Sequence, residues 1–267
     1  VSVTFNLINI ENSKFDTKIS KVNSIRDSKS AILDGSKDYS YIYTWNRADN
    51  LKNFGEGIVY KNYVAKNSNI FEKFKKAKNN FKPFFFCLWN KYSIKMANSI
   101  YLTVNQLSKP EQKEDFLSTI FPFYGKENYF NFFGKKGFIE SQLLISEEKL
   151  DIFLDEFKFF FKEYEPTITL FSLKNMSGKH KFLRFEDNKI CLTFDYVNNK
   201  RNLLFMSKID DLYNKYDILP SIIKDSRISK KTFDQIYKGE AVEFKKQLYN
   251  FDKNRSYQSE ISRRLEL

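Results

Sequence analysis

The stretch from residue 137 to residue 223 constrains the fold most strongly, because its apolar pattern changes several times between strand and helix periods. The elements it predicts, in chain order, are a strand at 137–145, a helix from 147, strands at 167–173 and 190–197, a helix at 203–216 and a strand at 218–223. This order is that of the ferredoxin-like split βαβ motif. We therefore expect an α+β fold, with an antiparallel sheet covered by helices on one face.

The helix that follows Ser146 carries the clearest signals. Ser146 is a favourable N-cap, and the two glutamates after it complement the positive end of the helix dipole. Apolar residues then recur at helical spacing and form one face: Leu150, Phe153, Leu154, Phe157 and Phe161. Pro166 follows the pattern and indicates its end.

The first third of the chain has a looser strand, helix, strand, strand order, and it shows no clear sequence repeat with the rest. Strands are predicted at 1–10, 39–45 and 58–64, the last two as antiparallel partners around Gly55 and Gly57. Further helices are predicted at 20–33, 69–78, 88–107, 111–120, 230–238 and 240–249.

The composition excludes a disordered chain. Hydrophobic residues make up 42% and aromatic residues 18% of the 267 positions, which is enough to bury a sizeable core. The net charge of +12 suggests nucleic acid, an anionic lipid surface or a phosphorylated substrate. The lysines are scattered, however, which favours an ordinary solvated basic surface. No apolar run reaches the roughly 18 residues that cross a bilayer.

Several common kinds of site lack their sequence signals. Cys87 and Cys191 are far apart in the sequence, and their spacing predicts neither a disulfide framework nor a metal site, which fits a reducing compartment. Gly55 and Gly57 lack the further glycine of a phosphate-binding loop. His180 is the single histidine and is interpreted as a solvated loop residue, without the Gly-x-Ser-x-Gly elbow of a hydrolase.

Charged residues cluster where the apolar strand at 218–223 ends. Lys224, Asp225 and Arg227 follow it directly, and Pro220 confines this strand to a sheet edge or a bulge. The residues alone leave two interpretations open. One is a local ion pair between Asp225 and Arg227 that ties the strand to the next helix, and the other is a binding or catalytic site.

Two further residues have both a structural and a functional interpretation. Cys191 lies in a predicted strand, where a cysteine is usually a small buried hydrophobic residue but can also line a pocket. Lys174 follows a predicted strand and is either an ordinary surface lysine or a pocket residue.

The charged cluster also belongs to a longer pattern. The C-terminal part of this pattern consists of Lys224 to Arg227, Phe233, Tyr237, Phe251-Asp252 and residues 259–267. Weaker similarities precede it in the same order, at residues 39–45, Gly55 to Gly57, Phe121-Pro122, Asn131, Gly134, Gly137-Phe138 and residues 188–191. Together these segments resemble the FAD-linked oxidases of the vanillyl-alcohol oxidase type, in particular the decaprenylphosphoryl-β-D-ribose oxidase branch.

The resemblance implies a domain organisation and a cofactor. Residues 1–10 would be the end of an FAD-binding domain or a linker strand, residues 11–223 the substrate-binding (cap) domain, and residues 224–267 a segment returning toward the flavin domain. FAD would be bound mainly by a domain that this chain does not contain. The implied activity is the oxidation of a sugar or polyol alcohol by hydride transfer to the flavin.

The resemblance also implies roles for individual residues. Lys224 would be catalytic, and five residues would bind substrate: Gln142, Lys174, Cys191, Glu140 and Lys189. Asp225 and Arg227 would be structural, and no metal site is implied. Three positions depart from the family, because Glu140 replaces a frequent glutamine, Lys189 a frequent asparagine and Phe121 a histidine. A change of pocket polarity at these positions indicates a different substrate.

The expected partners are a sugar or polyol, either free or linked to a lipid or a phosphate, an N-terminal FAD domain and, as a further candidate, a reductase, with no nucleic acid. The expected location is cytoplasmic, either in solution or peripheral at the inner face of the membrane. The alternative is a basic module without enzymatic activity that binds nucleic acid or an anionic surface, which the charge and the interleaved aromatic residues favour.

Overall fold

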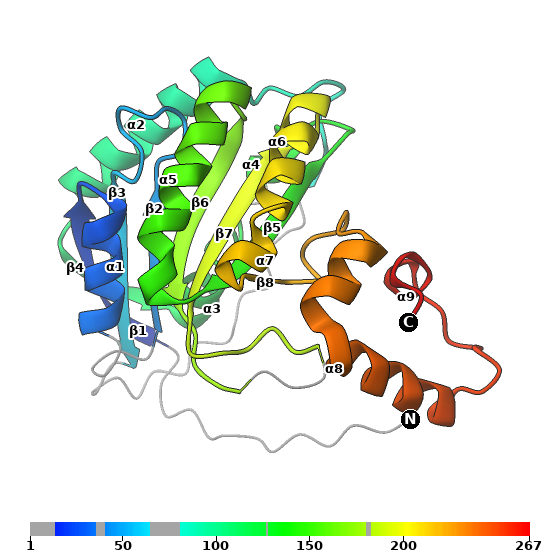
Figure 1. Ribbon diagram of the computed structural model, residues 1–267. Coiled ribbons are helices and arrows are strands. Elements are labelled where there is room, and N and C mark those ends of the chain that lie inside the picture. The colour runs from blue at the N-terminus through cyan, green and yellow to red at the C-terminus, as the bar shows by residue number, and fades with distance from the viewer. Residues whose placement is uncertain (1–13, 36–40, 65–80, 127, 180–182) are drawn as a thin grey trace.

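One antiparallel sheet organises the computed structural model, which describes residues 14–35, 41–64, 81–126, 128–179 and 183–267 (Figure 1). Its strands are β1 (Lys14–Val22), β2 (Tyr41–Asn46), β3 (Gly57–Val64), β4 (Glu111–Asp115), β5 (Phe138–Ile145), β6 (Ile168–Asn175), β7 (Ile190–Val197) and β8 (Leu219–Pro220). They lie in the order β4-β1-β3-β2-β6-β7-β5-β8. The predicted strand at 1–10, the predicted helix at 69–78 and His180 lie outside the described residues.

The second half of the chain confirms the expected α+β, ferredoxin-like arrangement. Strand β5 pairs with β7 on one side and with β8 on the other, and β6 pairs with β7, all antiparallel. The spatial order β8-β5-β7-β6 is therefore that of a split βαβ motif, with α5 (Glu147–Tyr164) and α6 (Lys200–Asp210) as its two helices.

The first half has the same strand order, which the sequence did not reveal. Its elements are β1, α1 (Ile25–Asp34), β2, β3, α2 (Lys91–Leu107) and β4, and its strands lie in the order β4-β1-β3-β2. The two halves differ in the placement of the second helix. Helix α2 packs on the face of the sheet opposite to α1, where its Leu102 contacts Ile58 and Tyr60 of β3.

Strands β2 and β6 join the two halves into one sheet. Tyr43 of β2 lies opposite Lys174 of β6, and Asn46 lies opposite Phe171. The hydroxyl of Thr44 also accepts a 2.9 Å hydrogen bond from the backbone N–H of Leu173. Side chains from both halves therefore lie on the same continuous face of the sheet.

The first face of the sheet carries the main apolar core beneath α1, α5 and α6 (Figure 1). Phe194 of β7 is at its centre, with its ring stacked 4.5 Å from Phe171 and 5.1 Å from Phe157 between centroids. The apolar face predicted for α5 is confirmed, because Leu150, Phe153, Leu154, Phe157 and Phe161 are all buried. Aromatic pairs of this geometry add to the burial of apolar area.

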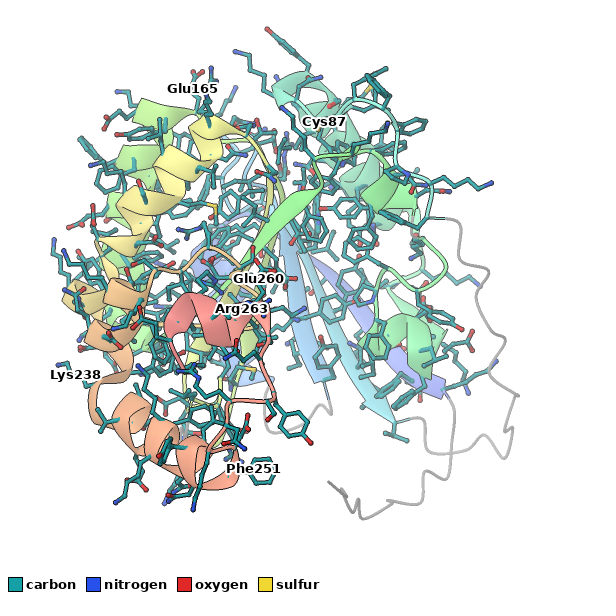
Figure 2. All side chains as sticks on the ribbon, turned by 90° about the vertical axis from the view of Figure 1, so that its right-hand side faces the viewer. Cys87, Glu165, Lys238, Phe251, Glu260 and Arg263 are labelled. Atoms are coloured by element: carbon teal, nitrogen blue, oxygen red, sulfur yellow. The ribbon has the colours of Figure 1, made fainter. Side chains whose placement is uncertain are left out.

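The second face of the sheet is only partly covered, whereas the sequence predicted helices on one face. Helix α2 lies over β2 and β3, and α8 (Lys230–Phe251) and α9 (Glu260–Leu265) pack near β8. Figure 2 views the molecule from the right-hand side of Figure 1, with α9 in front of the left half and the strands visible beside it. Polar side chains line the part of the face that lies between these helices.

Several element boundaries differ from the prediction for identifiable reasons. Residues 111–115 form strand β4 and only 116–120 form a helix (α3, Phe116–Ile120), because the strand has no apolar residues and its pattern resembles a polar helix. Strand β8 is only two residues long, since Pro220 cannot donate to the sheet. The helix predicted at 203–216 is divided into α6 and α7 (Tyr213–Tyr216).

Three further differences concern α8, α4 (Asn128–Asn131) and β1. The predicted helices at 230–238 and 240–249 form one element, α8, which is broken at Lys238, where φ is 33° and ψ is −116°. The short helix α4 was not predicted, and strand β1 includes residues 20–22 that were assigned to a helix.

A charged network fastens the C-terminal segment to the rest of the chain. The guanidinium of Arg227 donates to Asp210 at 2.8 Å and to Asp225 at 2.9 Å, and the Asp225 side chain is fully buried. Arg264 of α9 donates to the backbone carbonyl of Ile228. Arg264 therefore anchors α9 to the segment that follows β8.

We expect Arg227→Met to destabilise the protein by about 3–5 kcal/mol, because the buried Asp225 carboxylate would lose its cation. Urea denaturation followed by circular dichroism measures this difference. Lys230→Met is the matched control, since the Lys230–Asp234 pair is solvent-exposed and its removal should leave the midpoint nearly unchanged. Equal midpoints for the Arg227 variant and the parent would contradict the structural role of Arg227.

Candidate functional site

Polar and ionisable side chains of β5, β6 and β7 gather on the second face of the sheet. Their positions follow from strand alternation, since Leu143, Leu192 and Phe194 point into the main core and the residues between them point to the opposite side. Cross-strand pairing then places Glu140 beside Asp195 and Gln142 beside Thr193. Lys174 is paired with Cys191 in the same way. We call this group, together with Lys224 and Tyr129, the polar floor.

Lys224 lies at the accessible edge of the polar floor. Its ammonium nitrogen is 3.2 Å from Oε2 of Glu140. Gln142 donates from Nε2 to the other carboxylate oxygen of Glu140 at 2.9 Å. The Lys224 side chain is 48% exposed and that of Glu140 is 20% exposed, so a molecule bound at this edge can contact both.

Asp195 is the most perturbed carboxyl group of the polar floor. It is buried, and the hydroxyl of Tyr129 donates to its Oδ2 at 3.1 Å. Burial, and after it the neighbouring Glu140 carboxylate, raise the pKa of Asp195 to about 7, although Tyr129, Lys224 and Lys174 act in the opposite direction. Asp195 can therefore exchange a proton near neutral pH.

Cys191 lies deeper in the floor, opposite Lys174 of the neighbouring strand. Its thiol is buried and lies 3.8 Å from the hydroxyl of Thr193. Burial raises the pKa of Cys191 to about 11, which Lys174 and Thr193 counteract only in part. A thiol with such a pKa is neutral at physiological pH and is a poor nucleophile.

Tyrosines continue the polar floor toward α2. Tyr43, which is paired with Lys174 across the junction of the two halves, stacks on Tyr60 with centroids 4.8 Å apart. The Tyr60 hydroxyl is hydrogen-bonded to that of Tyr101 and donates to Oδ1 of Asn105 at 2.9 Å. Burial raises the pKa of Tyr43 and of Tyr60, so both remain neutral donors.

Most of the residues predicted for the site lie together. Lys224, Glu140, Gln142, Lys174 and Cys191 all belong to the polar floor. Asp225 and Arg227 lie behind it and form the ion pair that the sequence suggested as one interpretation of this segment.

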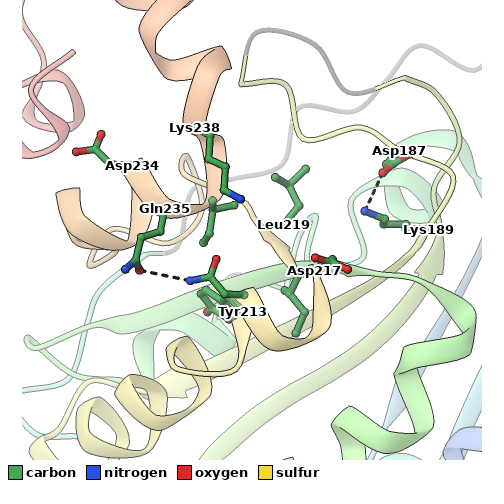
Figure 3. Close-up of a pocket in the computed structure, with 11 residues that line it drawn as sticks. Asp187, Lys189, Tyr213, Asp217, Leu219, Asp234, Gln235 and Lys238 are labelled. Atoms are coloured by element: carbon green, nitrogen blue, oxygen red, sulfur yellow. Dashed lines mark hydrogen bonds and ion pairs between the residues drawn. The ribbon is translucent and has the colours of Figure 1, made fainter.

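Lys189 is placed in a different surface cleft. Its ammonium is 2.9 Å from Asp187, and both residues line a cleft of about 600 Å³ between the chain before β7 and helices α7 and α8. Figure 3 shows this cleft, with Lys238 of α8 on the side opposite to Lys189. The mixed charges of its lining, with Asp217 and Asp234 beside the lysines, favour no particular ligand.

Asp195 and Tyr129 are the residues that the sequence did not single out. Asp195 follows the predicted alternation of β7, and its charge at a position opposite the core was the available signal. Tyr129 comes from α4, a four-residue helix without a usable pattern, so its approach to Asp195 depends on the tertiary structure.

Neither a metal centre nor a membrane-spanning segment is found in the part of the chain that the structure describes. No group of three His, Cys, Asp or Glu side chains there could hold a metal ion. None of the helices there has both the length and the hydrophobicity of a bilayer-spanning segment.

Comparison with known proteins gives a fold-level similarity. No family model matches the chain, and no curated protein matches it. Among solved structures it is similar to BBE-like #28 from Arabidopsis thaliana, with a TM-score of 0.39 and 10% identity over 76% of this chain. The chain spans 43% of the length of that protein. A similarity with so low a TM-score and identity supports no conclusion about activity.

We expect Asp195→Asn to change how stability depends on pH. The raised pKa means that the folded state holds a proton that the unfolded state releases above about pH 4. The free energy of unfolding of the parent should therefore fall between pH 4 and pH 7, by at most about 4 kcal/mol, and the variant should lack this fall. Urea denaturation at a series of pH values measures the difference between the two profiles.

The control for this experiment is Asp155→Asn, which changes an exposed carboxylate of α5 and should leave the pH profile of the parent intact. Parallel profiles for the parent and Asp195→Asn would refute the assignment of a perturbed Asp195. The amide can still accept the hydrogen bond from Tyr129, so the variant should keep the fold.

Proposed function

We propose that this chain is the substrate-binding and C-terminal part of an FAD-dependent oxidoreductase, which oxidises a sugar or polyol alcohol. The proposal rests on the polar floor, and above all on the contact between the accessible ammonium of Lys224 and the carboxylate of Glu140. The family resemblance of the segment that begins at Lys224 supports it. The proposal includes the class of substrate, the FAD domain and a reductase as partner.

Oxidation of an alcohol requires the loss of a proton from the hydroxyl oxygen and of a hydride from the carbon. A bound flavin would accept the hydride. In this proposal Glu140 would accept the hydroxyl proton, and Lys224, whose ammonium is 3.2 Å from Glu140, would stabilise the negative charge that develops on the oxygen. Asp195, beside Glu140 in the sheet, can take up that proton near neutral pH.

The remaining residues of the floor suit the recognition of a hydroxylated molecule. Gln142 and Lys174 supply N–H donors, and Tyr43 supplies an aromatic surface with a neutral hydroxyl. Cys191, as a neutral thiol, contributes shape more than reactivity.

The hydrogen-bond donors of the floor suit the isoalloxazine ring of a flavin, but they do not account for the binding of the pyrophosphate of FAD. Lys224 and Gln142 could donate to the carbonyl oxygens of a flavin ring that covers the floor. The sequence has no glycine-rich loop to hold the pyrophosphate, so the proposal assigns that part of FAD to another domain.

The direct test is expression of the complete open reading frame from which this chain derives. A yellow protein with a flavin absorption spectrum is expected, and its reduction by sugars and polyols can be screened under anaerobic conditions. A colourless full-length protein without an FAD domain would refute the proposed function.

We expect Lys224→Ala in the complete enzyme to slow reduction of the flavin by about 10²–10³-fold, because charge on the reacting oxygen would lose its cation. Stopped-flow spectroscopy at saturating substrate measures the step. Lys230→Ala, which removes a nearby lysine outside the floor, should leave the rate unchanged. Equal rates for Lys224→Ala and the parent would remove Lys224 from the mechanism.

A further inference from the structure

Helix α2 has two apolar faces, and only one of them is covered. Ile94 and Leu102 face the sheet and are buried. On the opposite side, residues at spacings of three and four form an exposed stripe: Tyr92, Met96, Ile100, Val104 and Leu107. Tyr92 is 74% exposed and Leu107 is 83% exposed. A helix that is apolar on both sides normally contacts something on both sides.

The segment before α2 extends this stripe with three phenylalanines. Phe84, Phe85 and Phe86 are 44%, 79% and 65% exposed. Their backbone is nevertheless held in place, since the N–H groups of Phe84 and Leu88 donate to the carbonyls of residues 131 and 132 at 3.1 and 2.8 Å.

Gly134 allows the close contact between this segment and the residues after α4. A Cβ atom at this position would lie 2.6 Å from the backbone carbon of Phe86, so the two segments can approach this closely only with glycine there. These three side chains are thus partly or largely exposed to solvent on a backbone that hydrogen bonds hold in place. Exposed apolar surface of this extent marks an interaction site.

The charge of this region is uniform. Residues 81–110 contain four lysines, at positions 82, 91, 95 and 109, and no aspartate, glutamate or arginine. Lys135 adds a further cation, with its ammonium 4.6 Å from the centre of the Phe85 ring. Lysines beside an apolar and aromatic stripe are the chemistry of a helix that lies at the surface of an anionic membrane.

We propose that the exposed face of α2 and Phe84 to Phe86 together dock on an anionic phospholipid surface. Phe, Tyr, Met, Ile, Val and Leu side chains would enter the boundary between headgroups and acyl chains, and the lysines would pair with lipid phosphates. This docking surface lies on the half of the molecule away from α8: Figure 2 shows Cys87, within the segment, far from Lys238 and Phe251. It is independent of the proposed function.

Other occupants fit less well. A second copy related by a twofold axis would bring the same lysines against each other without any acid from residues 81–110 to neutralise them. Nucleic acid would use the lysines and the aromatic rings, but the aliphatic residues at 96, 100, 104 and 107 offer no surface on which bases stack well.

Vesicle co-sedimentation of the full chain tests the proposal. We expect binding to phosphatidylcholine vesicles that contain about one-third phosphatidylglycerol, weaker binding to pure phosphatidylcholine, and a decrease of binding with added salt.

Phe85→Ser with Phe86→Ser should reduce the partition coefficient at least about tenfold, because two exposed rings are lost. Lys91→Gln with Lys95→Gln should reduce it roughly 25-fold, at about fivefold for each lysine.

Matched controls come from the opposite side of the sheet. Phe159→Ser changes a phenylalanine of α5 that is 65% exposed, and Lys162→Gln with Lys200→Gln changes two exposed lysines of α5 and α6. These variants should bind vesicles as the parent does. All the altered side chains are on the surface, so circular dichroism should show an unchanged fold.

Three outcomes would overturn the proposal. The first is equal vesicle binding by the parent and the Phe85/Phe86 variant. The second is a dimer, seen by analytical ultracentrifugation, that the same substitutions abolish while the parent shows no vesicle binding. The third is binding to a single-stranded oligonucleotide in place of vesicles, with loss in the Lys91/Lys95 variant.

Discussion

The pairing of β2 with β6 is the interaction on which the rest of this structure depends. Each half of the chain forms a four-stranded sheet with the order of a split βαβ motif, and this pairing makes one sheet of them. It sets Tyr43 beside Lys174 and thereby connects the tyrosines under α2 with the ionisable groups of β5 and β7. A slip of one residue at this pairing would turn the side chains of one strand to the other face and divide the polar floor.

The sequence predicted the second half well because its periodic signals are strong. Helix α5 has a serine at its N-cap position, whose side chain makes no capping hydrogen bond, as well as acidic residues in its first turn and a regular apolar face, and β7 is apolar at every core-facing position. The strand order of the first half was harder to predict, since β4 consists only of polar and charged residues. The sequence between β3 and α2 also gives no clear pattern. Lys224 could be found from its place after an apolar strand. For Asp195 the sequence offered only its charge within an apolar strand, because its burial depends on Tyr129 and on the neighbouring strands.

The family that the chain resembles often has glutamine at the position of Glu140, and here the carboxylate of Glu140 forms an ion pair with Lys224. A neutral amide at this position would leave the lysine charge available to an anion. With Glu140, the ammonium group of Lys224 is already paired with a carboxylate of the floor itself. We therefore expect a neutral hydroxylated molecule to suit the floor better than a phosphate does.

The two ends of the strand order also affect how copies of this chain behave toward one another. An edge strand offers unpaired backbone groups to which another chain can add, and such addition leads to aggregation. At one end, β4 is the polar run Glu111-Gln-Lys-Glu-Asp115, whose charges would be forced against those of a second copy. At the other end, β8 is two residues long and contains Pro220, which has no N–H to offer. In the part of the chain that the structure describes, both edges of the sheet are thus protected from self-templated growth, which discourages copies of this protein from adding to one another.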